Sequence, residues 1–85
     1  MVRSVSDEVI QVLRDALRIG ARADGMSTTT PLLGAIPELD SMAVVSVITA
    51  LEERYGIAFD DDEISGDAFE TVGSLAALVE AKLGE

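Results

Sequence analysis

Few side chains in this 85-residue sequence could take part in covalent chemistry. There is no Cys and no His, so two of the side chains most often used in catalysis are missing. The dipeptide Asp40-Ser41 is notable because it directly precedes a segment whose apolar residues recur with helical spacing. Ser41 is therefore predicted at a helix N-terminus, where unpaired backbone N–H groups and the helix dipole favour an anion. A phosphate esterified to Ser41 would be well placed there.

The structural alternative for Asp40-Ser41 is a simple helix cap. Asp and Ser side chains at such a position accept hydrogen bonds from first-turn amides, and capping is far commoner than modification. The dipeptide alone therefore leaves both interpretations open. Catalysis by the chain itself is not expected, because no Lys lies near Ser41 to act as a base.

Three helices are predicted from the spacing of apolar residues, over residues 4–19, 41–55 and about 72–83. A strand over residues 44–48 is rejected because the apolar pattern continues at helical spacing without a turn signal. The predicted caps and stops are Ser4 or Ser6, Gly20, Gly56 and Thr71. The expected inner faces are Val5, Val9, Leu13, Ala16 and Leu17; Val44, Ile48, Leu51 and Tyr55; and Val72, Leu75, Ala76, Val79 and Leu83.

The connection between the first two helices, residues 20–37, contains Gly, Thr, Ser and two Pro residues and shows no helical periodicity. Connections this long are uncommon in compact domains and are often functional. Three large apolar residues of this connection, and a fourth just after it, would be unusual in a solvated linker. We expect all four to fold back onto the core, namely Leu32, Leu33, Ile36 and Leu39.

Six acidic residues lie between Asp60 and Glu70. An EF-hand calcium loop starting at Asp60 is excluded, because its sixth position would be Ser65 in place of Gly and its twelfth Thr71 in place of Glu. No specific metal site is predicted. We expect a solvated acidic loop that binds divalent cations weakly, then a short helical turn from Ser65 that inserts Phe69 into the core.

Composition indicates one helical domain over residues 1–85 with an aliphatic core, since there are two Phe, one Tyr and no Trp. No apolar run approaches the roughly twenty residues of a membrane span, and no signal region is recognised, so a cytoplasmic monomer without membrane contact is expected. Residues 1–37 carry four basic and four acidic side chains, whereas residues 38–85 carry two and twelve. Such an acidic half repels nucleic acid and attracts basic protein patches, although solubility alone explains the same charge.

Three segments resemble the acyl carrier protein family in residue type and spacing. They are Leu39-Asp40-Ser41-Met42, residues 50–57 and residues 71–75. Proteins of that family carry 4′-phosphopantetheine on the serine of an Asp-Ser-Leu motif. The resemblance implies Ser41 as the attachment residue and Asp40 as its motif neighbour, with Met42 in place of leucine. The run from Gly34 to Met42 also resembles discrete carriers associated with bacterial exopolysaccharide and exosortase systems.

The resemblance covers most of the chain and implies an all-α four-helix bundle with a long first loop and a short third helix. It implies a carrier and not an enzyme: a phosphopantetheinyl transferase would move the arm from coenzyme A to Ser41, and the arm's thiol would hold acyl groups as thioesters. Acyl or aminoacyl ligases and transferases with basic docking patches would be its further partners. The alternatives are a peptidyl (aminoacyl) carrier and an unmodified helical interaction module that binds a basic partner.

The second helix departs from fatty acid carriers at its head. Those carriers typically have acidic residues two and five positions after the modified serine, where this chain has Ala43 and Ser46, both expected to face solvent. This difference favours a dedicated acyl or aminoacyl ligase, or a peptide or polyketide assembly system, over the housekeeping fatty acid pathway. The residues expected to meet partner enzymes are Met42, Thr49, Glu52 and Glu53.

Overall fold

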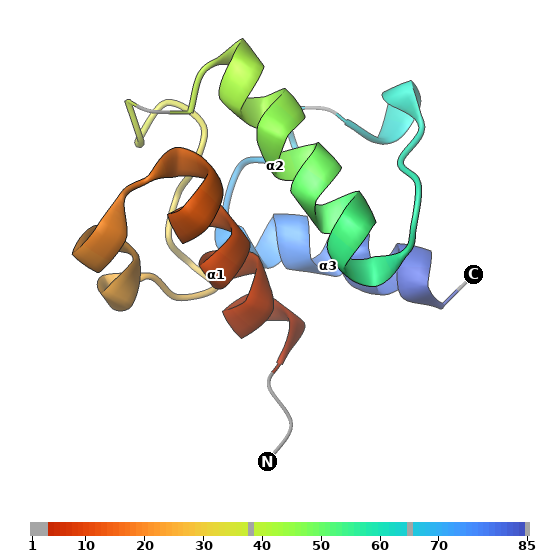
Figure 1. Ribbon diagram of the computed structural model, residues 1–85, viewed down its shortest axis with the longest axis horizontal. Coiled ribbons are helices and arrows are strands. Elements are labelled where there is room, and N and C mark those ends of the chain that lie inside the picture. The colour runs from red at the N-terminus through yellow and green to blue at the C-terminus, as the bar shows by residue number, and fades with distance from the viewer. Residues whose placement is uncertain (1–3, 38, 65, 85) are drawn as a thin grey trace.

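The computed structural model describes residues 4–37, 39–64 and 66–84. Over these residues the elements are α1 (Val5–Leu17), η1 (Gly20–Gly25), α2 (Ser41–Tyr55), η2 (Asp61–Glu63) and α3 (Val72–Leu83), where η denotes a 3-10 helix. Helices α1 and α2 lie side by side, and α3 crosses behind them (Figure 1). The only β-type pairing in the described ranges is an isolated bridge between Pro31 and Thr71. The expected all-α architecture is confirmed.

Helix α1 is shorter than predicted. Its N-cap is Ser4, whose hydroxyl accepts a first-turn N–H at 3.2 Å. The helix ends at Leu17 because Arg18 takes the left-handed conformation, with φ of 55°. The predicted end at Ile19 with Gly20 as the stop is therefore wrong. The turn at Arg18 directs Ile19 into the core, and the 3-10 helix η1 that follows was not predicted.

The connection to α2 is fastened along the start of α3 by backbone hydrogen bonds. They are Leu32 N–H to Glu70 O at 3.0 Å, Leu33 N–H to Phe69 O at 2.9 Å, Val72 N–H to Thr30 O at 3.0 Å and Gly73 N–H to Thr28 O at 2.8 Å. Leu32 and Leu39 are buried and Ile36 is partly buried, as predicted. The prediction that Leu33 also folds inward is wrong: a turn begins at Leu33 and leaves its side chain exposed, while Leu32 takes the inward position.

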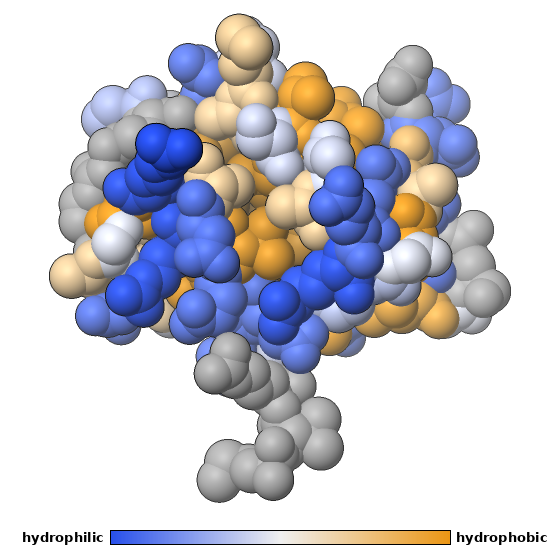
Figure 2. All heavy atoms as spheres, viewed as in Figure 1, coloured by the Kyte–Doolittle hydropathy of each residue, from blue (hydrophilic) through white to orange (hydrophobic). Residues whose placement is uncertain are grey.

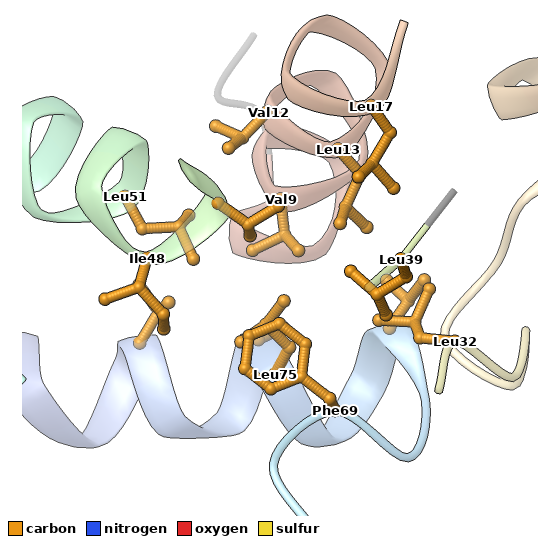
Figure 3. Packing of buried hydrophobic residues seen from close by; sticks show 14 of the residues in the cluster. Val9, Val12, Leu13, Leu17, Leu32, Leu39, Ile48, Leu51, Phe69 and Leu75 are labelled. Carbon is orange, nitrogen blue, oxygen red and sulfur yellow. The ribbon is translucent and has the colours of Figure 1, made fainter. Parts of the chain in front are cut away.

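One apolar core receives side chains from all three helices and from the connection (Figure 3). In the part of the chain that the structure describes, no polar or charged side chain is buried. Val12 and Val47 are buried although they lie outside the predicted faces, because the inner face of each helix is broader than one stripe. Leu83 is substantially exposed, contrary to prediction, since it is the last residue of α3 and lies at the end remote from α1 (Figure 1).

The start of α3 is fixed by a reciprocal capping box. The Thr71 hydroxyl accepts the Ser74 N–H at 3.1 Å, and the Ser74 hydroxyl accepts the Thr71 N–H at 3.0 Å. The predicted short helical turn ahead of it begins at Ser65, which lies outside the described residues. Residues 66–69 form a turn, preceded by η2, and Phe69 inserts into the core as expected. No helix in the described ranges is long and apolar enough to cross a membrane.

Candidate functional site

The N-terminus of α2 separates the two roles that the sequence left open for Asp40-Ser41. Asp40 is the N-cap, and its Oδ1 accepts the Ala43 N–H at 2.8 Å. Ser41 is the first residue of the helix, and its side chain is exposed. Among residues 4–37, 39–64 and 66–84, no hydrogen bond engages the Ser41 hydroxyl. The cap therefore leaves this hydroxyl available for chemistry.

Ser41 lies at a hollow of about 240 Å³ beside the start of α2. The hollow brings together three segments of the chain: the head of α2, the connection before it, and the more distant segment before α3. Its lining residues are Leu33, Ser41, Val44, Ile64, Gly66 and Phe69. Apart from Ser41 these residues are apolar, so the hollow suits an alkyl chain better than a charged group.

The acidic segment between α2 and α3 is held in place at two points. Glu52 Oε2 accepts the Phe59 N–H at 2.8 Å. Glu63 Oε1 accepts the Asp60 N–H at 2.9 Å and bonds the Lys82 Nζ at 2.9 Å. The backbone bond from Asp60, together with the Lys82 ammonium, holds the pKa of Glu63 below its ordinary value. No group of three or more potential metal-ligating side chains is found in the described ranges.

The far end of α2 is tied to α1 through Tyr55. The phenol of Tyr55 donates a hydrogen bond to Glu8 Oε1 at 2.6 Å, and Arg54 Nε lies 3.7 Å from the same oxygen. Burial and, second to it, the Glu8 carboxylate raise the pKa of Tyr55 to about 12. Both ends of α2 are therefore anchored, which fixes the helix that presents Ser41.

The expected partner residues have different environments on α2. Met42, Thr49 and Glu53 are exposed, as the prediction requires. Glu52 is partly buried and its carboxylate is engaged by the following segment, so it serves the fold as well as any partner. Sequence analysis missed Val45, which is exposed one turn after Met42. The sequence did indicate this exposure, because Val45 is a large apolar residue that falls outside the inner face predicted for the helix.

The two positions where fatty acid carriers typically have acids differ from each other. Ser46 is exposed, as expected. Ala43 is partly buried against the core, so the prediction that it faces solvent is wrong. It lies one helical turn before the buried Val47, and the inner face of α2 therefore begins at Ala43.

A serine that is exposed at the head of a capped helix, beside an apolar hollow, and unbonded within the described residues is the arrangement expected of a protein that carries a covalently attached group. The family model described as the phosphopantetheine attachment site matches residues 7–79. Over 81 residues the chain is 33% identical to the acyl carrier protein MbtL of Mycobacterium bovis and of Mycobacterium tuberculosis, covering 93% of this chain and 88% of those proteins. With MbtL of Mycolicibacterium paratuberculosis it shares 34% identity over 80 residues, covering 92% and 82%.

The solution structure of a holo acyl carrier protein from Nitrosomonas europaea superposes with a TM-score of 0.89 at 54% identity, covering 94% of this chain and 96% of that one. This chain belongs to the acyl carrier protein family. Its cofactor is covalently attached 4′-phosphopantetheine, and it is a carrier rather than a catalytic enzyme. Like other members it works with partner enzymes such as transferases and synthetases.

Proposed function

We propose that this acyl carrier protein bears its 4′-phosphopantetheine arm on Ser41. The observation that carries the proposal is the division of roles at the head of α2, where Asp40 makes the cap and the exposed Ser41 hydroxyl has no hydrogen bond to any described residue. The unpaired first-turn N–H groups and the helix dipole favour the negative phosphodiester that attachment creates. The hollow of about 240 Å³ offers an apolar surface beside it.

Attachment requires a phosphopantetheinyl transferase and coenzyme A. The Ser41 oxygen attacks the phosphorus that bears pantetheine, the pyrophosphate P–O bond breaks, and adenosine 3′,5′-bisphosphate leaves. The serine proton passes to a base of the transferase, since this chain offers no His or Cys. Once bound, the group supplies a thiol that holds acyl cargo as a thioester. The role of Ser41 is then to tether the arm, and the role of α2 is to present it.

The further partners that we propose are the acyl or aminoacyl ligases and transferases that load and unload the arm. Of the residues expected to meet them, Met42 and Thr49 are exposed on the uncharged part of α2, and Glu53 is exposed farther along the helix. Glu52 contributes less, because Phe59 already occupies its carboxylate. A cytoplasmic location is proposed for these encounters.

The experiment treats the purified protein with coenzyme A and a broad-specificity phosphopantetheinyl transferase until the reaction is complete, and then measures intact mass. The wild type is expected to gain the mass of one phosphopantetheinyl group. Ser41→Ala should gain nothing, while the matched variant Ser46→Ala, an exposed serine on the same helix, should be modified like the wild type. Circular dichroism of each variant checks that the fold is retained. Modification of Ser41→Ala at another serine would refute the assignment.

A further inference from the structure

The exposed apolar side chains of this protein are not scattered evenly. In the described ranges, four large hydrophobic residues are strongly exposed: Leu33 at 50%, Met42 at 80%, Val45 at 65% and Leu83 at 44%. The first three lie around Ser41, because Leu33 lines the hollow with Ser41, Met42 follows it in the chain, and Val45 is one helical turn after Met42. Single exposed apolar residues need no explanation, but a cluster beside a modification site does. We call Leu33, Met42 and Val45 the apolar docking surface.

The same part of α2 carries no charge. From Ser41 through Leu51 the helix contains no Asp, Glu, Lys or Arg, although residues 38–85 carry twelve acidic side chains. The first charged residue of the helix, Glu52, lies about 16 Å along the axis from Ser41 at the usual rise per residue. Figure 2 shows tan and orange surface over the start of α2 and blue over its later turns. Apart from the Asp40 cap, an enzyme that reaches Ser41 therefore meets an uncharged part of this helix first.

We infer that the phosphopantetheinyl transferase that modifies Ser41 docks on the apolar docking surface through hydrophobic contact, and not by pairing a basic patch with α2. This inference rests on the proposed attachment at Ser41. Any transferase that brings coenzyme A to the Ser41 hydroxyl has to cover the neighbouring side chains, and Met42 and Val45 are the large ones within the first two turns. Burial of apolar surface is the favourable interaction that such side chains offer, and salt does not screen it.

The test measures the initial rate of arm transfer, as kcat/KM for the carrier, with a broad-specificity phosphopantetheinyl transferase and coenzyme A. For the wild type we expect less than about a twofold change between low and high NaCl, whereas charge-steered encounters lose about tenfold or more. Met42→Glu and Val45→Glu should each lower kcat/KM about tenfold or more, because the new charge is desolvated without a partner. Leu83→Glu, which changes an exposed apolar residue far from Ser41, should leave it unchanged.

Two results would overturn the inference: a rate that falls steeply with salt in the wild type, or Glu variants that react as fast as the wild type or faster. Faster Glu variants would show that the transferase reads negative charge on α2. Melting temperatures of all variants confirm that they fold. Different results would refute the proposed function. If the wild type stayed unmodified after prolonged incubation, or if Ser41→Ala were modified, Ser41 would not be the attachment site.

Discussion

Tyr55 offers a sharp test of how α2 is anchored, because it is the only Tyr in a chain without Trp. The ultraviolet absorbance of the phenolate therefore reports this one residue. In the structure its phenol donates to Glu8 Oε1 at 2.6 Å, and Arg54 lies beside the same carboxylate. We predict that the pKa of Tyr55 is about 12, against an ordinary value of 10.0. Glu8→Gln should lower this pKa, because the amide accepts the bond without a charge.

The magnitude follows from the causes of the shift. A rise from 10.0 to about 12 corresponds to at most about 2.7 kcal/mol at 1.36 kcal/mol per pKa unit. Tyr55 is only partly buried, so solvent screening reduces this to about 1 kcal/mol of folding free energy. Burial is the largest cause and survives the substitution, so the pKa of Tyr55 in Glu8→Gln should fall only part of the way to 10.0. Arg54 lowers this pKa, so Arg54→Met should raise it instead.

The sign of the pH dependence is fixed by the raised pKa. The neutral phenol of Tyr55 stabilises the folded state. Its contribution to the free energy of unfolding is fully present below the unfolded pKa of 10.0 and is lost as the pH rises through the folded pKa of about 12. The assay combines a spectroscopic titration of Tyr55 with denaturant unfolding at neutral and alkaline pH. Tyr55→Phe should cost about 1 kcal/mol at neutral pH and nothing above the pKa.

Two outcomes contradict this reasoning. A wild-type midpoint near 10.0 would mean that in solution Tyr55 is neither buried nor bonded to Glu8 as it is in the structure. Shifts of the same sign in Glu8→Gln and Arg54→Met would mean that the two charges do not act on the phenol as opposites. In either case the far end of α2 would need another anchor.

Three further predictions concern the elements around the site. Gly73→Ala should lower the melting temperature although alanine has the higher helix propensity, because the new Cβ would lie 2.8 Å from the Thr28 carbonyl oxygen of the connection. Gly25→Ala is the control, because a Cβ there would meet nothing within 4 Å. Asp40→Ala should reduce the free energy of unfolding by about 1 kcal/mol in denaturant titrations, and Asp40→Asn by less. Lys82→Met should lower the melting temperature, more at low salt than at high salt. Because the pKa of Glu63 is lowered in the folded protein, the Glu63 carboxylate stabilises the fold at pH values above its unfolded pKa. This stabilisation is lost as the pH falls through the folded-state pKa. Lys82→Met should make that pH-dependent loss smaller.

Local signals explain which parts of the fold were predictable. The bounds of α2 follow from Asp40 and Gly56, because a carboxylate cap and a glycine in the left-handed conformation act on neighbouring residues only. The end of α1 was mispredicted because Arg18, a residue with no preference for positive φ, makes the turn. The turn at Arg18 is accompanied by burial of Ile19, a tertiary contact that the local sequence does not encode.

The hollow beside Ser41 could not be predicted, because its lining comes from three segments that meet only in the folded chain. The pairing of the connection with the start of α3 decides that Leu32 points inward and Leu33 outward, and no local pattern encodes that choice. The residue that we propose for attachment, Ser41, comes from motif and context alone. Of the three residues in the proposed apolar docking surface, only Met42 was expected to meet partners, whereas Leu33 was assigned to the core and Val45 was missed.

The chain contains its own comparison for the role of Ser41. Ser4 is also a serine at a helix start, but it occupies the N-cap, and its hydroxyl is committed to a first-turn N–H at 3.2 Å. At the head of α2 the cap is Asp40, which moves the serine one residue into the helix and frees its hydroxyl. An aspartate directly before the serine therefore has a chemical consequence beyond helix stability. On our proposal this difference favours Ser41 over Ser4 as the residue that a transferase modifies, although both stand where the helix dipole favours a phosphate.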